Sequence, residues 1–120
     1  MAAIVRTLAD LIAREYGVRT RARFSAPGFQ AGVAISRAAR QAPNRIGLTM
    51  VNLSANVIYV SPDGVPSATH GVRLAPSGGN LTLNWREDTH LVGLEWSMLA
   101  SAAASDLIVL ETLILDPREG

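Results

Sequence analysis

Apolar and polar residues alternate from residue 44 to residue 63, and the rest of the chain is organised around this stretch. Ile46, Leu48 and Met50 fall on one side of the alternation, which has the two-residue period of a strand with one buried face. A second apolar run covers residues 57–60 and ends at a Pro-Asp-Gly sequence. The asparagines and the serine between the two runs favour a turn, because their side chains bond nearby backbone groups. The pattern therefore predicts a β-hairpin on which the other elements pack.

Three later segments also have the character of strands. Residues 81–85 alternate with Trp85 on their apolar face, and residues 90–96 repeat the pattern with Trp96. Residues 107–115 are apolar on both faces, which is typical of a strand in the middle of a sheet. Short strands separated by Gly and Pro turns predict a mainly β fold, either a small antiparallel β-sandwich or a jelly-roll-like barrel. Both tryptophans are expected in its core.

Residues 2–16 have the period of an amphipathic helix, and Gly17 is a natural C-terminal cap. A helix of this length is marginal alone in water, so its apolar stripe must dock, either on its own sheet or on a neighbouring subunit. Residues 18–43 are predicted to be an extended basic arm. The chain then divides into an N-terminal helix and basic arm, residues 1–43, and a β-sandwich domain, residues 44–120.

Charge is unevenly distributed between the two parts. The net charge is +1 and all eleven basic residues are arginine, yet residues 1–45 have a balance of +6 and residues 46–120 a balance of −5. Such asymmetry indicates that the two halves face different partners, or each other in a head-to-tail assembly. The candidate partner-binding residues are the apolar stripe of the helix and the arginines of the arm, namely Ile4, Leu8, Leu11, Ile12, Arg19, Arg21 and Arg23.

The sequence contains no recognisable arrangement of catalytic residues. It has no cysteine, and its two histidines, His70 and His90, are too few and too far apart for a His-Cys metal site. There is no G-x-S-x-G nucleophile elbow and no phosphate-binding Gly-Lys-Ser/Thr loop. Arg6 and Asp10 interrupt what would be a secretion signal, and no window approaches the ~20 apolar residues of a membrane span. We expect a non-enzymatic protein with no cofactor, no metal and no membrane contact.

The stretch from Asn44 to Leu115 resembles the small β-sandwich of virion proteins from tailed bacteriophages. That family comprises head decoration proteins, head-fibre bases and related minor structural proteins. The resemblance implies a non-enzymatic assembly role and carries over no site residues. The matching pieces are Asn44-Arg45, residues 48–52, Ser54, residues 57–60, residues 71–74, Ala75-Pro76, Gly78-Gly79, the strand from Leu81, and residues 107–111.

From this resemblance we expect a capsid decoration or cement protein, or a head-fibre base, anchored through its N-terminal helix and arm. Its partner would be the major capsid protein or another virion protein. The chain would form a homo-oligomer and reside in the virion, after assembly in the host cytoplasm. A neck, tail or baseplate component is one alternative. An arginine-arm module that binds nucleic acid is another, although a pI of 8.4 is below the usual range of basic domains. Only the tryptophans favour a third, a carbohydrate-binding or hydrolytic domain.

Overall fold

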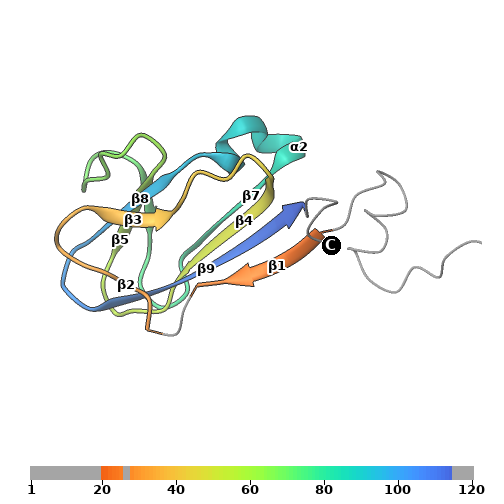
Figure 1. Cartoon of the computed structure of the whole chain (residues 1–120). Helices are drawn as coiled ribbons and strands as arrows, with labels where there is room; N and C mark the ends of the chain where they lie inside the picture. The colour runs from red at the N-terminus through yellow and green to blue at the C-terminus, as the bar shows by residue number, and fades with distance from the viewer. Residues whose placement is uncertain (1–19, 26–27, 115–120) are drawn as a thin grey trace, which may run out of the picture.

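The computed structural model describes residues 20–25 and 28–114, which form two antiparallel β-sheets packed on each other (Figure 1). The first sheet has the strand order β1-β9-β4-β7, with the short β2 also paired to β9, and the second has the order β3-β8-β5-β6. The predicted β-sandwich is therefore confirmed for the described residues. The elements are β1 Thr20–Phe24, β2 Gln30–Ala31, β3 Ser36–Ala39, β4 Arg45–Asn52, β5 Ile58–Ser61, β6 Val72–Leu74, β7 Asn80–Asn84, α2 Trp85–Asp88, the 3₁₀ helix η1 Thr89–Gly93, β8 Trp96–Ala100 and β9 Ser105–Ile114.

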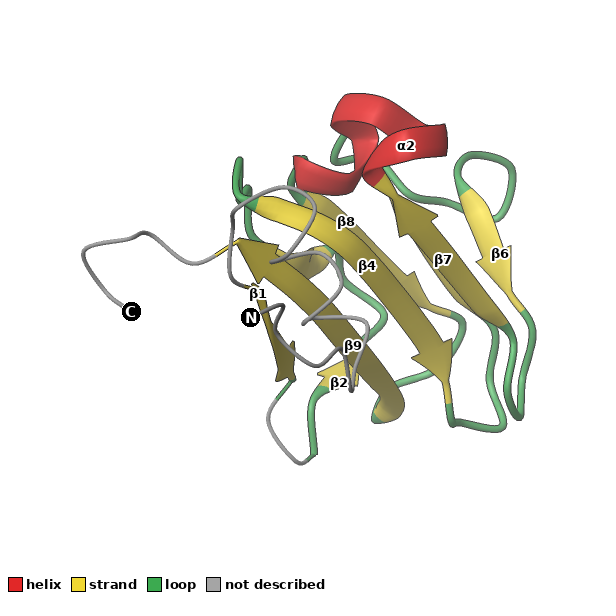
Figure 2. Cartoon of the chain, turned by 90° about the vertical axis from the view of Figure 1, so that its right-hand side faces the viewer, coloured by secondary structure: helices red, strands yellow, loops and turns green. Residues whose placement is uncertain are grey.

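The core lies between the two sheets, and in β4 and β9 it is built mainly by the alternation of buried and less buried side chains. β4 and β9 lie side by side in the middle of the first sheet, as Figure 2 shows. Their buried side chains alternate with less buried ones, as the two-residue period requires. β9 pairs with both β1 and β4, which confirms the predicted central strand as far as Ile114. The buried apolar residues of β4, β5, β8 and β9 are Leu48 and Met50, Ile58 and Val60, Trp96, Met98 and Ala100, and Leu107, Val109 and Leu113.

The predicted hairpin does not form. β4 belongs to the first sheet and β5 to the second, so residues 53–57 cross from one layer to the other. Asn52 is fully buried, and its side-chain amide donates to the carbonyls of Asn56 at 2.7 Å and Leu74 at 3.0 Å. Its Oδ1 accepts the backbone N–H of Ser54 at 2.9 Å. The hairpin prediction is wrong because these polar residues fix a crossing between layers, which has the same local sequence pattern as a tight turn.

The predicted arm is also built into the sandwich wherever the structure describes it. β1 and β2 pair with β9, and β3 pairs with β8. The alternating Arg21 and Arg23 lie on β1, which is an edge strand, where charged residues commonly prevent pairing with other chains. The boundary predicted at residue 43 therefore does not separate a folded domain from an arm between residues 20 and 43. The predicted helix over residues 2–16 lies outside the described residues.

The two tryptophans have different environments. β7 ends at Asn84, whose Oδ1 accepts the backbone N–H of Glu87 at 3.0 Å and so caps the short helix α2. Trp85 opens this helix and is 45% exposed, so the prediction that it is a core residue is wrong. Trp96 is only 3% exposed, as expected. The predicted strand over residues 90–96 is mostly the 3₁₀ helix η1, and β8 begins at its last residue.

Candidate functional site

A groove lies between β1, at the edge of the first sheet, and β3, at the edge of the second sheet. It has a volume of about 510 Å³. The described residues between 20 and 45 include five arginines and no acidic residue. Three of these arginines, Arg23, Arg37 and Arg40, line the groove, and we call it the basic groove. Its other lining residues are Phe24, Ser25, Phe29, Ala38, Ala39, Val109 and Glu111.

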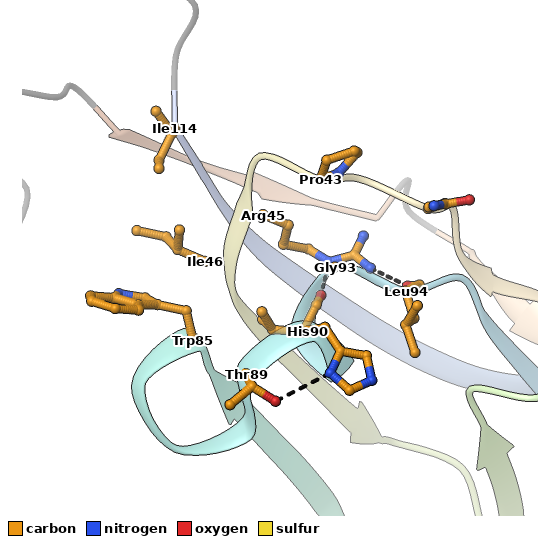
Figure 3. A pocket seen from close by; sticks show the side chains of 11 residues that line it. Pro43, Arg45, Ile46, Trp85, Thr89, His90, Gly93, Leu94 and Ile114 are labelled. Atoms are coloured by element: carbon orange, nitrogen blue, oxygen red, sulfur yellow. Dashed lines mark hydrogen bonds between the residues drawn. The ribbon is translucent and has the colours of Figure 1, made fainter.

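Arg45 is linked to the basic groove through Glu111, and its side chain has no exposed surface. Its guanidinium donates from Nε to the backbone carbonyl of Val92 at 2.7 Å and from Nη2 to that of Leu94 at 2.6 Å (Figure 3). Its Nη1 donates to the backbone carbonyl of Arg40 at 2.9 Å. These bonds tie the first residue of β4 to the loop before it and to the segment around η1. A buried arginine is tolerated here because its donors are satisfied in the fixed fork geometry of the guanidinium.

Glu111 provides the negative charge that balances this buried arginine. Its Oε2 accepts from Arg45 Nη1 at 2.8 Å, and its carboxylate also receives Arg23 in a two-pronged contact at 3.1–3.2 Å. Burial alone would raise the pKa of the Glu111 carboxyl, but the hydrogen bonds from Arg23 and Arg45 hold that pKa below its usual value. Glu111 is therefore a charged structural link between β9, β1 and β4 rather than a proton donor.

The rim of the basic groove carries positive charge that the acidic side chains of the described residues neutralise only weakly. Arg37 approaches Glu95 at 3.6 Å, with both side chains about half exposed, which is a weak surface contact. Arg21 and Arg40 form no salt bridge within residues 20–25 and 28–114. The groove therefore combines a floor in which Arg23 and Arg45 share Glu111 with Arg37 and Arg40 at its rim, where they can meet a negatively charged partner.

One cluster, Ser61, Asp63 and His70, contains the residue types of a catalytic triad but lacks the hydrogen bond between serine and histidine that a triad requires. Ser61 Oγ donates to Asp63 Oδ1, and His70 Nε2 contacts Asp63 Oδ2. Serine and histidine thus both bind the carboxylate and not each other, so the histidine cannot take the serine proton. Across the described residues there is also no group of three or more His, Cys, Asp or Glu side chains that could hold a metal ion. The cluster fixes the loop that follows β5.

Hydrogen bonds to Asp63, first from Ser61 and then from His70, lower the pKa of its carboxyl from 3.8 to about 2. The contribution of this carboxylate to stability is therefore fully present above pH ~3.8 and is lost as the pH falls through ~2. We expect Asp63 to titrate near pH 2 by NMR, and Ser61→Ala to move its pKa back toward 3.8. Thr69→Ala, in the same loop, should leave it unchanged; an Asp63 pKa near 3.8 in the unaltered protein would contradict the assignment.

A second, apolar cavity of about 580 Å³ opens beside α2 and η1 (Figure 3). Ile46, Trp85 and Ile114 lie along one side of it. His90 is at another side, where its Nδ1 is 3.3 Å from Thr89 Oγ1. No acidic residue lines the cavity, so His90 has no carboxylate partner there for acid–base catalysis. The apolar lining of this cavity suits burial of apolar groups rather than chemistry.

The structure places only part of the predicted partner-binding set. Arg21 and Arg23 lie on β1, with Arg23 held by Glu111, while the other predicted residues, Ile4, Leu8, Leu11, Ile12 and Arg19, lie outside the described residues. Arg37 and Arg40 were not among the predicted residues. They belong to the same basic segment of the sequence, but only the pairing of β3 with β8 brings them beside β1.

Comparison with protein-family models, with curated proteins and with solved structures found no match for this chain. None of the helices among the described residues is long and apolar enough to cross a membrane. Function must therefore be argued from the surface of the sandwich itself.

Proposed function

We propose that this chain is a non-enzymatic structural protein of a virus particle, of the kind found in tailed bacteriophages. In this proposal it attaches to an acidic surface of the major capsid protein or another virion protein through the basic groove. The observation that carries the attachment mode is the gathering of Arg23, Arg37 and Arg40 along the groove between β1 and β3. The resemblance of the sequence to phage virion sandwiches supplies the biological setting.

The construction of the groove suits protein binding. Arginine is enriched at energetically important positions of interfaces, because its planar fork pairs with carboxylates in two places. The Arg45–Glu111–Arg23 contacts hold the groove in place before any partner binds, so little ordering is needed on association. Phe29 and Val109 supply apolar lining between the charges.

The test is charge reversal at the rim, with Arg37→Glu combined with Arg40→Glu. Neither side chain contributes a buried contact, so the melting temperature should stay within a few degrees of that of the unaltered protein. Co-sedimentation with capsid shells should fall at least about tenfold, which corresponds to a loss of about 1.4 kcal/mol. Arg73→Glu is the matched control, since Arg73 is an exposed arginine on β6 at the other edge of the second sheet.

Undiminished binding by the double variant would refute the groove as the attachment site, and equal weakening by Arg73→Glu would show that only net charge matters. The location of the protein within the particle is tested by repeating the binding measurement with neck, tail and baseplate proteins beside capsid shells. Sedimentation velocity of the unaltered protein and of the double variant, each without a partner, tests whether the same groove joins copies of this chain head to tail.

One observation supports nucleic acid as a second candidate partner. Phe24 is 66% exposed at the rim of the basic groove, next to Arg23, and an exposed aromatic beside arginines can stack on a nucleobase. Fluorescence anisotropy with single-stranded DNA distinguishes the two partners. Nucleic-acid binding predicts strong salt dependence and a clear loss on Phe24→Ala, whereas attachment to an acidic protein predicts little affinity for DNA at physiological salt.

A further inference from the structure

Four loops that connect one sheet to the other at the same end of the sandwich contain no charged residue. In the second sheet Ile58 pairs with both Leu74 and Ala100, so the loops that adjoin these residues lie at one end. The N–H of Ala100 donates to the carbonyl of Gly32 at 2.8 Å, which brings the loop between β2 and β3 to this end as well. The helix α2 lies at the opposite end, where each connection between strands carries at least one charged residue (Figure 2). We call the first end the uncharged tip, and its loops are residues 32–35, 53–57, 75–79 and 101–104.

The uncharged tip exposes large apolar side chains to water. Val33 is 65% exposed, Leu53 is 54% exposed and Ile35 is 50% exposed. Ala103 and Ala104 add further exposed apolar surface from the loop between β8 and β9. Exposed apolar residues that gather in this way mark a contact surface.

Hydrogen bonds between the loops fix the shape of the uncharged tip. The N–H of Ser77 donates to the carbonyl of Ser54 at 2.9 Å, which ties loop 75–79 to loop 53–57. The N–H of Ser101 donates to the carbonyl of Val57 at 2.9 Å, which ties loop 101–104 to the same loop. Because the surface is formed before any partner binds, little ordering is needed on association.

We propose that the uncharged tip is a dimerisation surface, on which a second copy of this chain docks with its own tip. A partner that placed charged side chains here would lose their hydration without gaining a counter-charge, so the partner surface must also be uncharged. A second copy meets this condition because it carries the same tip, and a two-fold axis sets the two tips against each other. This inference does not depend on the basic groove.

The composition and size of the uncharged tip fit a protein partner. Its loops contain no arginine or lysine to neutralise phosphates and no aromatic residue to anchor a loop at a membrane surface. Its eighteen residues are close to the ~20–30 residues that each side contributes to a standard protein interface. The nearest charged residues along the chain are Arg37 on β3, Arg73 on β6 and Asp106 on β9. They provide a polar rim around an apolar centre, as is usual in protein interfaces.

Charged substitutions at the tip test the proposal. In sedimentation velocity the unaltered protein should form a dimer at micromolar concentration, and Val33→Glu with Leu53→Glu should weaken it at least about tenfold. Both side chains are exposed, so the melting temperature of this variant should stay within a few degrees of that of the unaltered protein. Val65→Glu is the matched control, because Val65 is a similarly exposed valine in the loop after β5 and lies away from the tip. It should leave the dimer unchanged.

Mixing variants of opposite charge shows whether two tips meet each other. Val33→Lys with Leu53→Lys should also be monomeric alone, whereas an equimolar mixture with the double glutamate variant should form a heterodimer, since tip-to-tip contact brings the opposite charges together. A monomer at every concentration of the unaltered protein, or a mixture that stays monomeric, would overturn the proposal. Loss of the dimer in Arg40→Glu but not in the tip variants would also overturn it, and would assign association to the basic groove.

Discussion

A chain that begins at Asn44 is expected to show no cooperative thermal transition, because it lacks β1, β2 and β3. β9 loses the partner that runs along half of its length, and β8 loses its neighbour at the edge of the second sheet. Eleven strand residues leave the two sheets, and each backbone hydrogen bond contributes about 0.5–1.5 kcal/mol. The total is comparable with the whole stability of a domain, about 5–15 kcal/mol. Far-UV circular dichroism during heating is the measurement.

A chain that begins at Thr20 is the matched control. It keeps every described strand, the Arg23 contact with Glu111 and the buried Ala31, Ala38 and Ala39. We expect it to retain β-type circular dichroism and a cooperative melt. A cooperative melt from the shorter chain would instead show that residues 44–114 form a complete folding unit and that the first three strands are accessory.

Replacing Arg45 by methionine is expected to lower the free energy of unfolding by about 3–5 kcal/mol. Methionine keeps much of the volume, but it leaves the Glu111 carboxylate with only Arg23 and removes the donors to the carbonyls of Val92 and Leu94. Lysine should rescue little, because a single ammonium cannot reproduce the guanidinium fork. Urea denaturation followed by the fluorescence of the buried Trp96 measures the loss.

Arg73→Met controls for the removal of one arginine, since Arg73 is exposed and should change stability by no more than about 0.5 kcal/mol. Combining Arg45→Met with Glu111→Gln should cost less than the sum of the two single changes, because the double variant removes both charges of the Arg45–Glu111 pair together. A loss below about 1 kcal/mol for Arg45→Met would mean that water replaces the lost donors and that the contacts of Arg45 are not needed for folding.

Local pattern predicts those parts of this fold in which side-chain alternation and burial agree. β9 is apolar on both faces and lies between two partners, and β4 and β7 alternate as half-buried strands do. Alternation carries no information about which layer a strand joins. The crossing between β4 and β5 therefore resembles a hairpin in the sequence. In the structure, β4 pairs with β9 and β7, whereas β5 pairs with β8 and β6.

The residues of the basic groove could not be grouped from the sequence, because pairing between strands far apart in the chain brings them together. Strict alternation sets Arg45 opposite Ile46 and Leu48, on the exposed side, but the register shifts between Arg45 and Gly47 and turns this arginine inward. Its counter-charge, Glu111, comes sixty-six residues later. β1 to β3 are short and only weakly patterned, so they gain their strand conformation from β9 and β8, and the extended arm was the natural interpretation of their sequence.

The position of β9 also determines when the protein can fold. It is the last described strand of the chain, yet it lies in the centre of the first sheet, and its pairing of Thr20 with Ile114 joins the two ends of the described chain. A growing polypeptide on the ribosome therefore exposes β4 with an unpaired edge until the residues of β9 have been synthesised. Closing so long a loop slows folding, and strands that wait unpaired are prone to aggregate. A premature stop before residue 105 would therefore leave both β1 and β4 without their common partner.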